Sequence, residues 1–290
     1  MTDSVPAART QRLRSIFNFQ PGEGRRVAIM ILYSAASIGG VLTVGMAAAD
    51  ALFIAQLPAS DLPFLFILPA VAIAPAVFFY NRLAPRLPAQ RAIIASNILL
   101  LCLIALFRIL LATAIGKSFP VLAALELTIE VSYTLVILQF WTVAGRIFNV
   151  REAKRLYGVI AAGGTVANIL AGLVIGSLSS SIGAENLLFI VIAALLVCSL
   201  CARSVIRLTP LVPVDPAALP RPKSEPPRSS FQQDIRSLWR SPLLRAIGGL
   251  TILLSLLINI GMYQFCLALQ ANFAGRSTDL AAYLGALEFL

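Results

Sequence analysis

Long apolar runs, each of about 20 residues or more, restrict the fold of this chain more than any other feature. A helix of that length crosses the hydrocarbon core of a bilayer, so each run is a candidate membrane span. The seven runs are Val27–Leu57, Leu62–Tyr80, Ala92–Ile115, Pro120–Phe148, Tyr157–Ile182, Leu187–Val205 and Leu243–Leu269. The sequence therefore predicts an all-α membrane protein.

Composition excludes several classes of function. Hydrophobic residues make up 59% of the 290 residues and charged residues only 12%, which lies outside the range of soluble domains. The net charge of +10 does not indicate nucleic-acid binding, because the basic residues are spread over several loops and do not form one face or tail. The chain has no histidine, which excludes histidine-dependent catalysis and histidine metal sites. We therefore expect no enzyme.

The positions of lysine and arginine predict the orientation in the membrane. Loops rich in basic residues stay in the cytoplasm. Of the 23 basic residues, 20 precede the first span or fall on the same side of the predicted bundle. Lys117 and Arg276 fall on the other side, and Arg108 lies inside a span. We expect a multi-pass protein of the cell (inner) membrane with a cytoplasmic amino terminus.

The chain divides into four predicted regions. Residues 1–26 form a cytoplasmic tail, and residues 27–205 form a first bundle of six transmembrane helices. Residues 206–242 form a basic cytoplasmic linker, because the stretch 208–230 holds seven prolines and cannot be a regular helix. The segment "FQQDIRSLWRS" at its end predicts a short amphipathic helix at the membrane surface. Residues 243–290 begin a second bundle with span seven and an incomplete span eight.

This layout predicts the architecture of a transporter. Six spans, a long cytoplasmic loop and the start of a second set are typical of carriers built from two six-helix halves. The basic stretch "NRLAPRLPAQR" lies between spans two and three, where major facilitator proteins carry a turn-forming motif that it loosely resembles. The expected fold is a major facilitator-like six-helix half plus the start of a second half, in a truncated chain.

Charge gathers at one place between spans four and five. The stretch "FWTVAGRIFNVREAKRLYGVIAAGG" holds five charged residues, which are Arg146, Arg151, Glu152, Lys154 and Arg155. We expect them to lie in a cytoplasmic turn, where they reach water and anionic headgroups. One interpretation is an ordinary positive-inside turn. The other is a cytoplasmic gate that collects anions at the entrance of a transport path.

The same stretch resembles a known family. "FW" at Phe140 and Trp141, "REAKRLYGVI" from Arg151 and "AAGGTVANILAG" from Ala161 are similar to the ATP/ADP translocases, the nucleotide transporters of plastids and intracellular bacteria. Shorter matches are "DALF" from Asp50, "YQF" and "AAYLGAL". The resemblance implies a facilitator-like antiporter that binds ATP and ADP and works by alternating access. It also implies membrane lipid as the surroundings and no metal or organic cofactor.

The first span departs from that family. The family carries an arginine and a lysine around its aspartates there, whereas "VGMAAADALFIAQL" keeps Asp50 without a basic residue. Some bacterial relatives look similar at this point and continue into helical-repeat or cyclic-nucleotide-binding domains. The alternative is therefore a non-transporting membrane unit that anchors or senses for such a downstream regulatory domain.

Four ionisable residues fall inside predicted spans, and they are Asp50, Arg108, Glu126 and Glu130. A charge at the bilayer centre costs about 2.5–3.5 kcal/mol even on insertion scales, so each needs a partner or a purpose. Depth along the spans predicts that Arg108 pairs with Glu126 near Asp50. Glu130 lies one turn deeper without an obvious cation. The four residues either form a structural network or leave Glu130 to take a proton or face a cation.

Small residues repeat at intervals of four in span five, at Gly164, Asn168, Gly172 and Gly176. Such spacing allows helix backbones to approach closely. Tight packing is one interpretation of the pattern. The other is that Gly163 and Gly164 loosen the start of the helix, so that it bends during transport.

Polar residues also repeat at intervals of four in span seven, at Thr251, Ser255, Asn259 and Tyr263. They line one face of the predicted helix. Asn259 and Tyr263 are candidates for a cavity wall that contacts substrate. Hydrogen bonds between helices explain the same pattern equally well.

Overall fold

The computed structural model describes residues 23–61, 63–208, 242–273, 276, 278–281 and 283–284. Nearly all of these residues are helical, and no strand occurs among them. Seven of the described helices are long and apolar enough to cross a membrane, as the sequence predicts. The predicted amino-terminal tail, except for its last residues, and the predicted amphipathic helix lie outside the described residues.

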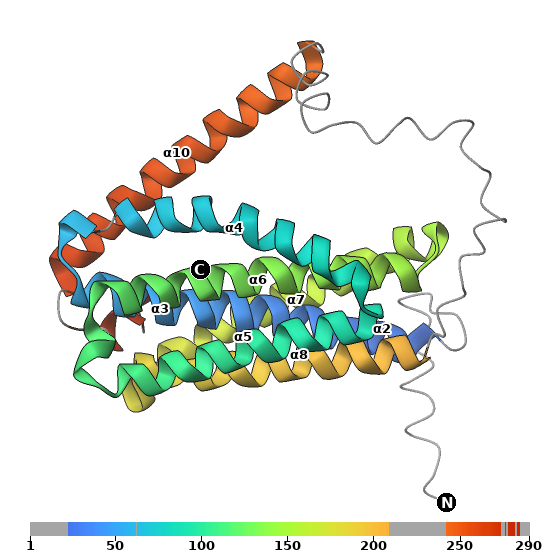
Figure 1. Ribbon diagram of the computed structural model, residues 1–290, viewed down its shortest axis with the longest axis horizontal. Coiled ribbons are helices and arrows are strands. Elements are labelled where there is room, and N and C mark those ends of the chain that lie inside the picture. Colours follow the sequence, from blue (N-terminus) through green and yellow to red (C-terminus); the bar gives the residue numbers. More distant parts are fainter. Residues whose placement is uncertain are drawn as a thin grey trace, which may run out of the picture.

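Eight α-helices and one π-helical segment make up the seven spans in the described part of the chain (Figure 1). The first span consists of α2 (Glu23–Ala35), the π-helical segment η1 (Ala36–Val44) and α3 (Gly45–Gln56). The others are α4 (Pro63–Leu83), α5 (Ala89–Leu111), α6 (Phe119–Ile147), α7 (Val150–Ile182), α8 (Leu188–Leu208) and α10 (Pro242–Phe273). Short 3-10 turns are η2 (Ala59–Asp61), η3 (Ala84–Arg86), η4 (Ala114–Lys117) and η5 (Ala184–Leu187).

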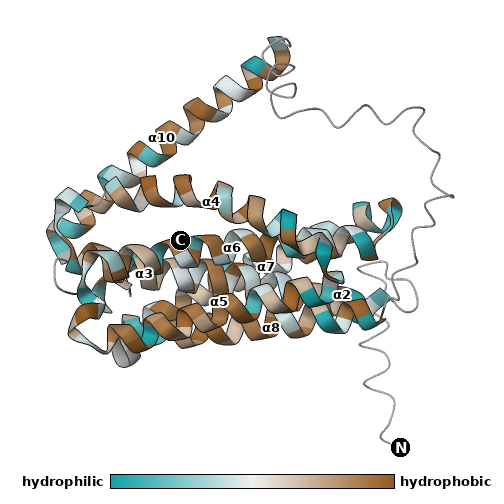
Figure 2. Ribbon diagram, in the orientation of Figure 1, coloured by the Kyte–Doolittle hydropathy of each residue, from teal (hydrophilic) through white to brown (hydrophobic). Residues whose placement is uncertain are grey.

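The first span is the centre of the bundle. It packs against α6, α7 and α8 along its length, while α5 packs against α8 and α6. In Figure 1, α10 leans away from the bundle and meets it only near its carboxyl end. Figure 2 shows hydrophobic residues over most of the helical surface and hydrophilic residues gathered near the helix ends. This distribution is that of helices surrounded by lipid.

The π-helical segment brings the first span into close contact with its neighbours. Gly39 and Gly40 leave no room for a side chain, because a Cβ on Gly39 would lie 2.8 Å from the carbonyl oxygen of Ala167 in α7. A Cβ on Gly40 would overlap Ala194 of α8. The hydroxyl of Thr43 donates to the carbonyl of Ile38, 3.0 Å away. Glycine is needed here because the helix backbones approach closely.

The connection between α6 and α7 differs from the prediction. We expected span five to begin near Tyr157 after a charged turn, but only Phe148 and Asn149 separate the two helices. The charged residues from Arg151 onward therefore belong to the first turns of α7. The reason is local, because Asn149 caps that helix: its Oδ1 accepts the backbone N–H groups of Arg151 (3.1 Å) and Glu152 (2.9 Å).

Candidate functional site

Two acidic side chains of α6 and one of α3 act together inside the bundle. Glu126 is buried, with 3% of its surface exposed, and Glu130 is half-buried one turn further along α6. Asp50 and Glu130 are the charged side chains that act electrostatically on Glu126. We define these three residues, Asp50 of the first span and Glu126 and Glu130 of α6, as the acidic cluster.

One carboxylate oxygen of the acidic cluster receives no hydrogen bond from the described residues. Within that part, Oε2 of Glu126 is buried and has no hydrogen-bond partner. A buried carboxylate without a donor is costly, and the cost is removed when it takes a proton or meets a cation. The arrangement is chemically suited to hold one positive charge.

An aromatic pocket lies between the first span, α6 and α7, and its lining residue Tyr133 follows Glu130 by three positions on α6. Its volume is about 280 Å³, and it is lined by Ser34, Ile38, Tyr133, Ile137, Phe140, Trp141, Ala144, Tyr157, Ile160, Ala161 and Thr165. Trp141 keeps 49% of its surface exposed. The lining is mostly apolar, with the hydroxyl-bearing side chains of Ser34, Tyr133, Tyr157 and Thr165 among it. Such a mixture suits a flat, partly polar ligand.

Edge-to-face ring contacts fix the aromatic side chains of this pocket. Trp141 contacts Phe140 (5.2 Å between ring centroids) on α6 and Tyr157 (5.5 Å) on α7. Phe140 also contacts Tyr33 of α2 at 5.4 Å, and Tyr157 contacts Phe148 at 6.1 Å. This geometry is the preferred one for aromatic pairs. The chain of rings joins all three walls and holds Trp141 in place.

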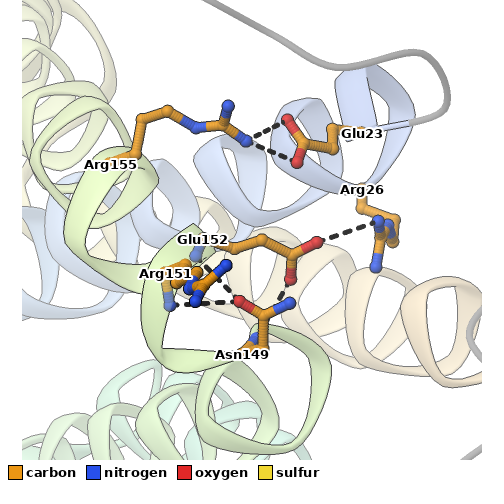
Figure 3. Close-up of polar contacts among 6 residues, drawn as sticks. All are labelled: Glu23, Arg26, Asn149, Arg151, Glu152 and Arg155. Carbon is orange, nitrogen blue, oxygen red and sulfur yellow. Dashed lines mark hydrogen bonds and ion pairs between the residues drawn. The ribbon is translucent and has the colours of Figure 1, made fainter.

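Charged residues tie the ends of α2 and α7 together (Figure 3). The guanidinium of Arg155 donates to both carboxylate oxygens of Glu23, at 2.5 and 2.7 Å. Glu23 is buried, with 2% exposed. Arg26 forms a second ion pair with Glu152 at 3.7 Å, and Oε2 of Glu152 accepts the backbone N–H of Asn149 at 3.0 Å. We call the pair of Glu23 and Arg155 the α2–α7 clamp.

The clamp divides the five charged residues that the sequence groups together. Glu152 and Arg155 face α2 and are half-buried, whereas Arg146, Arg151 and Lys154 are exposed. We call these three exposed residues the basic end. Among these five charged residues, the basic end is the part exposed to an approaching anion.

Comparison with known proteins identifies the family. The family described as "TLC ATP/ADP transporter" matches residues 118–290, which is more than half of the chain and includes α6, α7 and α10. The chain belongs to this ATP/ADP transporter family. Neither a search of curated proteins nor one of solved structures finds a match.

The family and the seven apolar helices together make the protein a multi-pass membrane transporter of nucleotides. The resemblance read from the sequence is therefore confirmed. The family is one of transporters and not of enzymes. It gives no support to the alternative of a sensor with a downstream regulatory domain.

The predicted pairing of Arg108 with Glu126 is wrong. In this transporter the Nε of Arg108 donates to Oδ1 of Asn186 at 3.0 Å, and Nη2 donates to the same oxygen at 2.5 Å. The guanidinium also lies over the ring of Phe189, 5.3 Å from its centroid. Depth alone suggested the pair, but Arg108 lies on the face of α5 that is turned to η5 and α8. It therefore does not join the acidic cluster.

The small residues of α7 pack closely against the first span. A Cβ on Gly163 would lie 2.6 Å from Cγ2 of Ile31, and one on Gly164 would lie 2.6 Å from Oγ of Ser34. Gly172 is buried and Gly176 is half-buried. The helix continues without a break from Val150 to Ile182. The packing interpretation therefore fits this structure, which shows no loosening at the paired glycines.

The polar row of α10 contacts the bundle only at its last member. Asn259 is exposed, and its amide donates to the carbonyl of Ser255 in its own helix at 2.7 Å. Tyr263 is half-buried and meets Phe66 of α4 edge to face, with 6.3 Å between centroids. The amide of Gln270 donates to the carbonyl of Leu57, which anchors the end of α10. Asn259 therefore lies on the exposed part of α10.

Sequence reasoning missed four residues at this site. Tyr133 and Tyr157 line the pocket, and Glu23 and Asn149 fix the start of α7. The pattern of Asn149 followed three positions later by Glu152 is a helix-capping signal that was present in the sequence. The spacing of Tyr133 from Glu130 and Trp141 also marks a single face of α6. By contrast, no local pattern joins Glu23 to Arg155.

Proposed function

We propose that this transporter exchanges ATP for ADP by alternating access. The observation that carries the proposal is the extent of the family match, which includes both α6 and α7. These two helices supply Glu126, Glu130, two walls of the aromatic pocket and the basic end. An acidic cluster, a pocket and a basic entrance thus lie along one pair of helices.

Each part has a role in the proposed cycle. The basic end attracts the phosphates of an arriving nucleotide, and its exposure makes that attraction fast. The half-buried Glu130 takes up a proton or faces a cation when the neighbouring charges require it. The α2–α7 clamp keeps the first span and α7 moving as one body. Tyr263 and Asn259 form part of a cavity wall contributed by α10.

The proposed orientation places the basic end in the cytoplasm of the cell, at its inner membrane. The support is the large excess of basic residues on this side. In the same proposal, residues 1–26 are a cytoplasmic tail and residues 206–242 are a cytoplasmic linker. The first six spans form one facilitator-like half, and α10 opens the next.

Exchange is tested with full-length protein in proteoliposomes. Uptake of labelled ATP is measured with vesicles that hold ADP and with vesicles that hold none. We expect internal ADP to accelerate uptake severalfold. Equal uptake in both kinds of vesicle would rule out exchange, and no uptake in either would rule out ATP as the substrate.

The role of Glu130 is tested with a matched pair of variants. Glu130→Gln should abolish the acceleration by internal ADP while the amount of inserted protein stays unchanged. Glu185→Gln is the control, because Glu185 is also half-buried but lies in η5 and not on α6. Equal loss of exchange in both variants would show that Glu130 has no special role in coupling.

A further inference from the structure

The aromatic pocket has no assigned ligand, and its position on α6 argues against a lipid. Glu130, Tyr133, Ile137 and Trp141 follow one another at three- and four-residue intervals, so they share one face of the helix. Tyr133 lies within the electrostatic range of Glu130. An ionisable residue within a span faces a water-filled cavity or other protein and not acyl chains. Glu130 therefore faces protein or water on the side of α6 that also carries the pocket residues Tyr133, Ile137 and Trp141.

The two ends of the pocket differ in charge. Toward the acidic cluster, the carboxylates of Glu126 and Glu130 repel phosphate. Toward the other end, Lys154 precedes Tyr157 by three residues and Arg146 follows Trp141 by five. At 1.5 Å per residue these offsets are about 4.5 and 7.5 Å along the helices. Phosphates attached to a ligand in the pocket would therefore extend toward the basic end.

We propose that the aromatic pocket binds the base of the nucleotide, with Trp141 and Tyr157 as its stacking surfaces and the basic end binding the phosphates. The assignment rests on the proposed function and names where its substrate sits. Stacking on an aromatic ring works for any base, because every base has a π-face, and it is strong enough to position the base. The exposed indole of Trp141 supplies such a surface. Exposed cations one to two turns away supply the charge that complements a polyphosphate.

The base half of the site is tested by equilibrium binding to full-length protein in nanodiscs. The ligands are ATP, adenosine and inorganic tripolyphosphate. Trp141→Leu should weaken binding of ATP and adenosine by about tenfold or more, because it removes the stacking ring. It should leave tripolyphosphate binding unchanged, which also shows that the variant is folded. Trp141→Phe should restore most of the affinity.

The matched control for this variant is Phe78→Leu. Phe78 of α4 is 60% exposed and lies outside the pocket, so its loss should change none of the three affinities. The phosphate half is tested by the double variant Arg151→Gln with Lys154→Gln. This variant should weaken ATP and tripolyphosphate and leave adenosine unchanged.

Several results would overturn the assignment. The assignment fails if Trp141→Leu leaves the affinity for ATP unchanged. It also fails if Trp141→Leu weakens the binding of all three ligands equally, or if Phe78→Leu weakens binding as much as Trp141→Leu does. Co-purified lipid that Trp141→Leu removes, with ATP affinity intact, would identify a lipid groove. If Trp141→Leu still binds and exchanges ATP normally, the assignment fails and the proposed function stands. If binding follows the expected pattern but internal ADP never accelerates uptake, exchange fails and the base site stands.

Discussion

Three glycine-to-alanine substitutions test how tightly the first span and α7 are held together. Gly39 meets the backbone of Ala167, with the carbonyl oxygen 2.8 Å and the carbonyl carbon 3.1 Å from an added Cβ. Gly163 meets the side chain of Ile31, with Cγ2 at 2.6 Å. Gly158, on the same helix as Gly163, has no atom within 4 Å of an added Cβ. The series runs from a rigid obstacle through a movable one to open space.

The magnitudes follow from two opposing effects. Alanine gains about 0.5–1 kcal/mol over glycine within a helix at each position. Overpacking against a well-packed interior costs about 1–3 kcal/mol. Because the helix gain is shared, Gly39→Ala should be less stable than Gly158→Ala by about 1–3 kcal/mol. Gly163→Ala should fall between the two, since it meets a side chain, which gives way by a few tenths of an ångström more easily than a helix backbone does.

The measurement is reversible unfolding in detergent micelles, followed by circular dichroism, with the free energy of unfolding compared across the three variants. Gly158→Ala should be at least as stable as the unmodified protein. Equal stability of Gly39→Ala and Gly158→Ala would refute the close approach of η1 to α7. It would also remove the reason for placing Ser34 and Ile38 on the wall of the aromatic pocket.

Three further predictions concern polar contacts. A double-mutant cycle with Glu23→Gln and Arg155→Gln should give a coupling free energy of about 1–2 kcal/mol in unfolding experiments, because the two side chains form a partly buried ion pair. A coupling free energy of zero would disprove the clamp. Arg108→Gln and Asn186→Ala should each lower the free energy of unfolding by about 1–2 kcal/mol and should not be additive; additive losses would mean that the two side chains do not bond. Asn149→Ala should cost about 1 kcal/mol by removing the cap of α7, and an unchanged unfolding midpoint would contradict the capping role.

The spans were predictable because hydrophobicity along a chain is local information. All seven were found from apolar runs alone, and their observed bounds lie within a few residues of the predicted ones, apart from the start of span five. That error came from treating charge as a sign of a loop. Arg151 and Lys154 are good helix formers, and the cap at Asn149 marks the true start of α7.

The partners of the charged residues were not predictable, because they depend on the rotation of each helix about its axis. The sequence places Arg108 and Glu126 at similar depth, but depth leaves the direction of each side chain open. Glu23 and Arg155 are separated by 132 positions, and no periodicity connects them. The π-helical segment adds to the difficulty, because its wider turn rotates α3 relative to α2 and so changes which face carries Asp50.

The position of the acidic cluster also explains how a nucleotide transporter can lack a basic residue beside Asp50 in α3. Phosphates placed beside Asp50 would face Glu126 and Glu130 as well, so a lysine there would have to offset three carboxylates before it attracted a ligand. The exposed cations of α6 and α7 have no such opposition at the other end of the pocket. Binding the phosphates at that end and the base between the aromatic rings separates like charges by the length of the pocket. In the proposed site, a polyphosphate would be held without neutralising the cluster, which would leave Glu130 available for coupling.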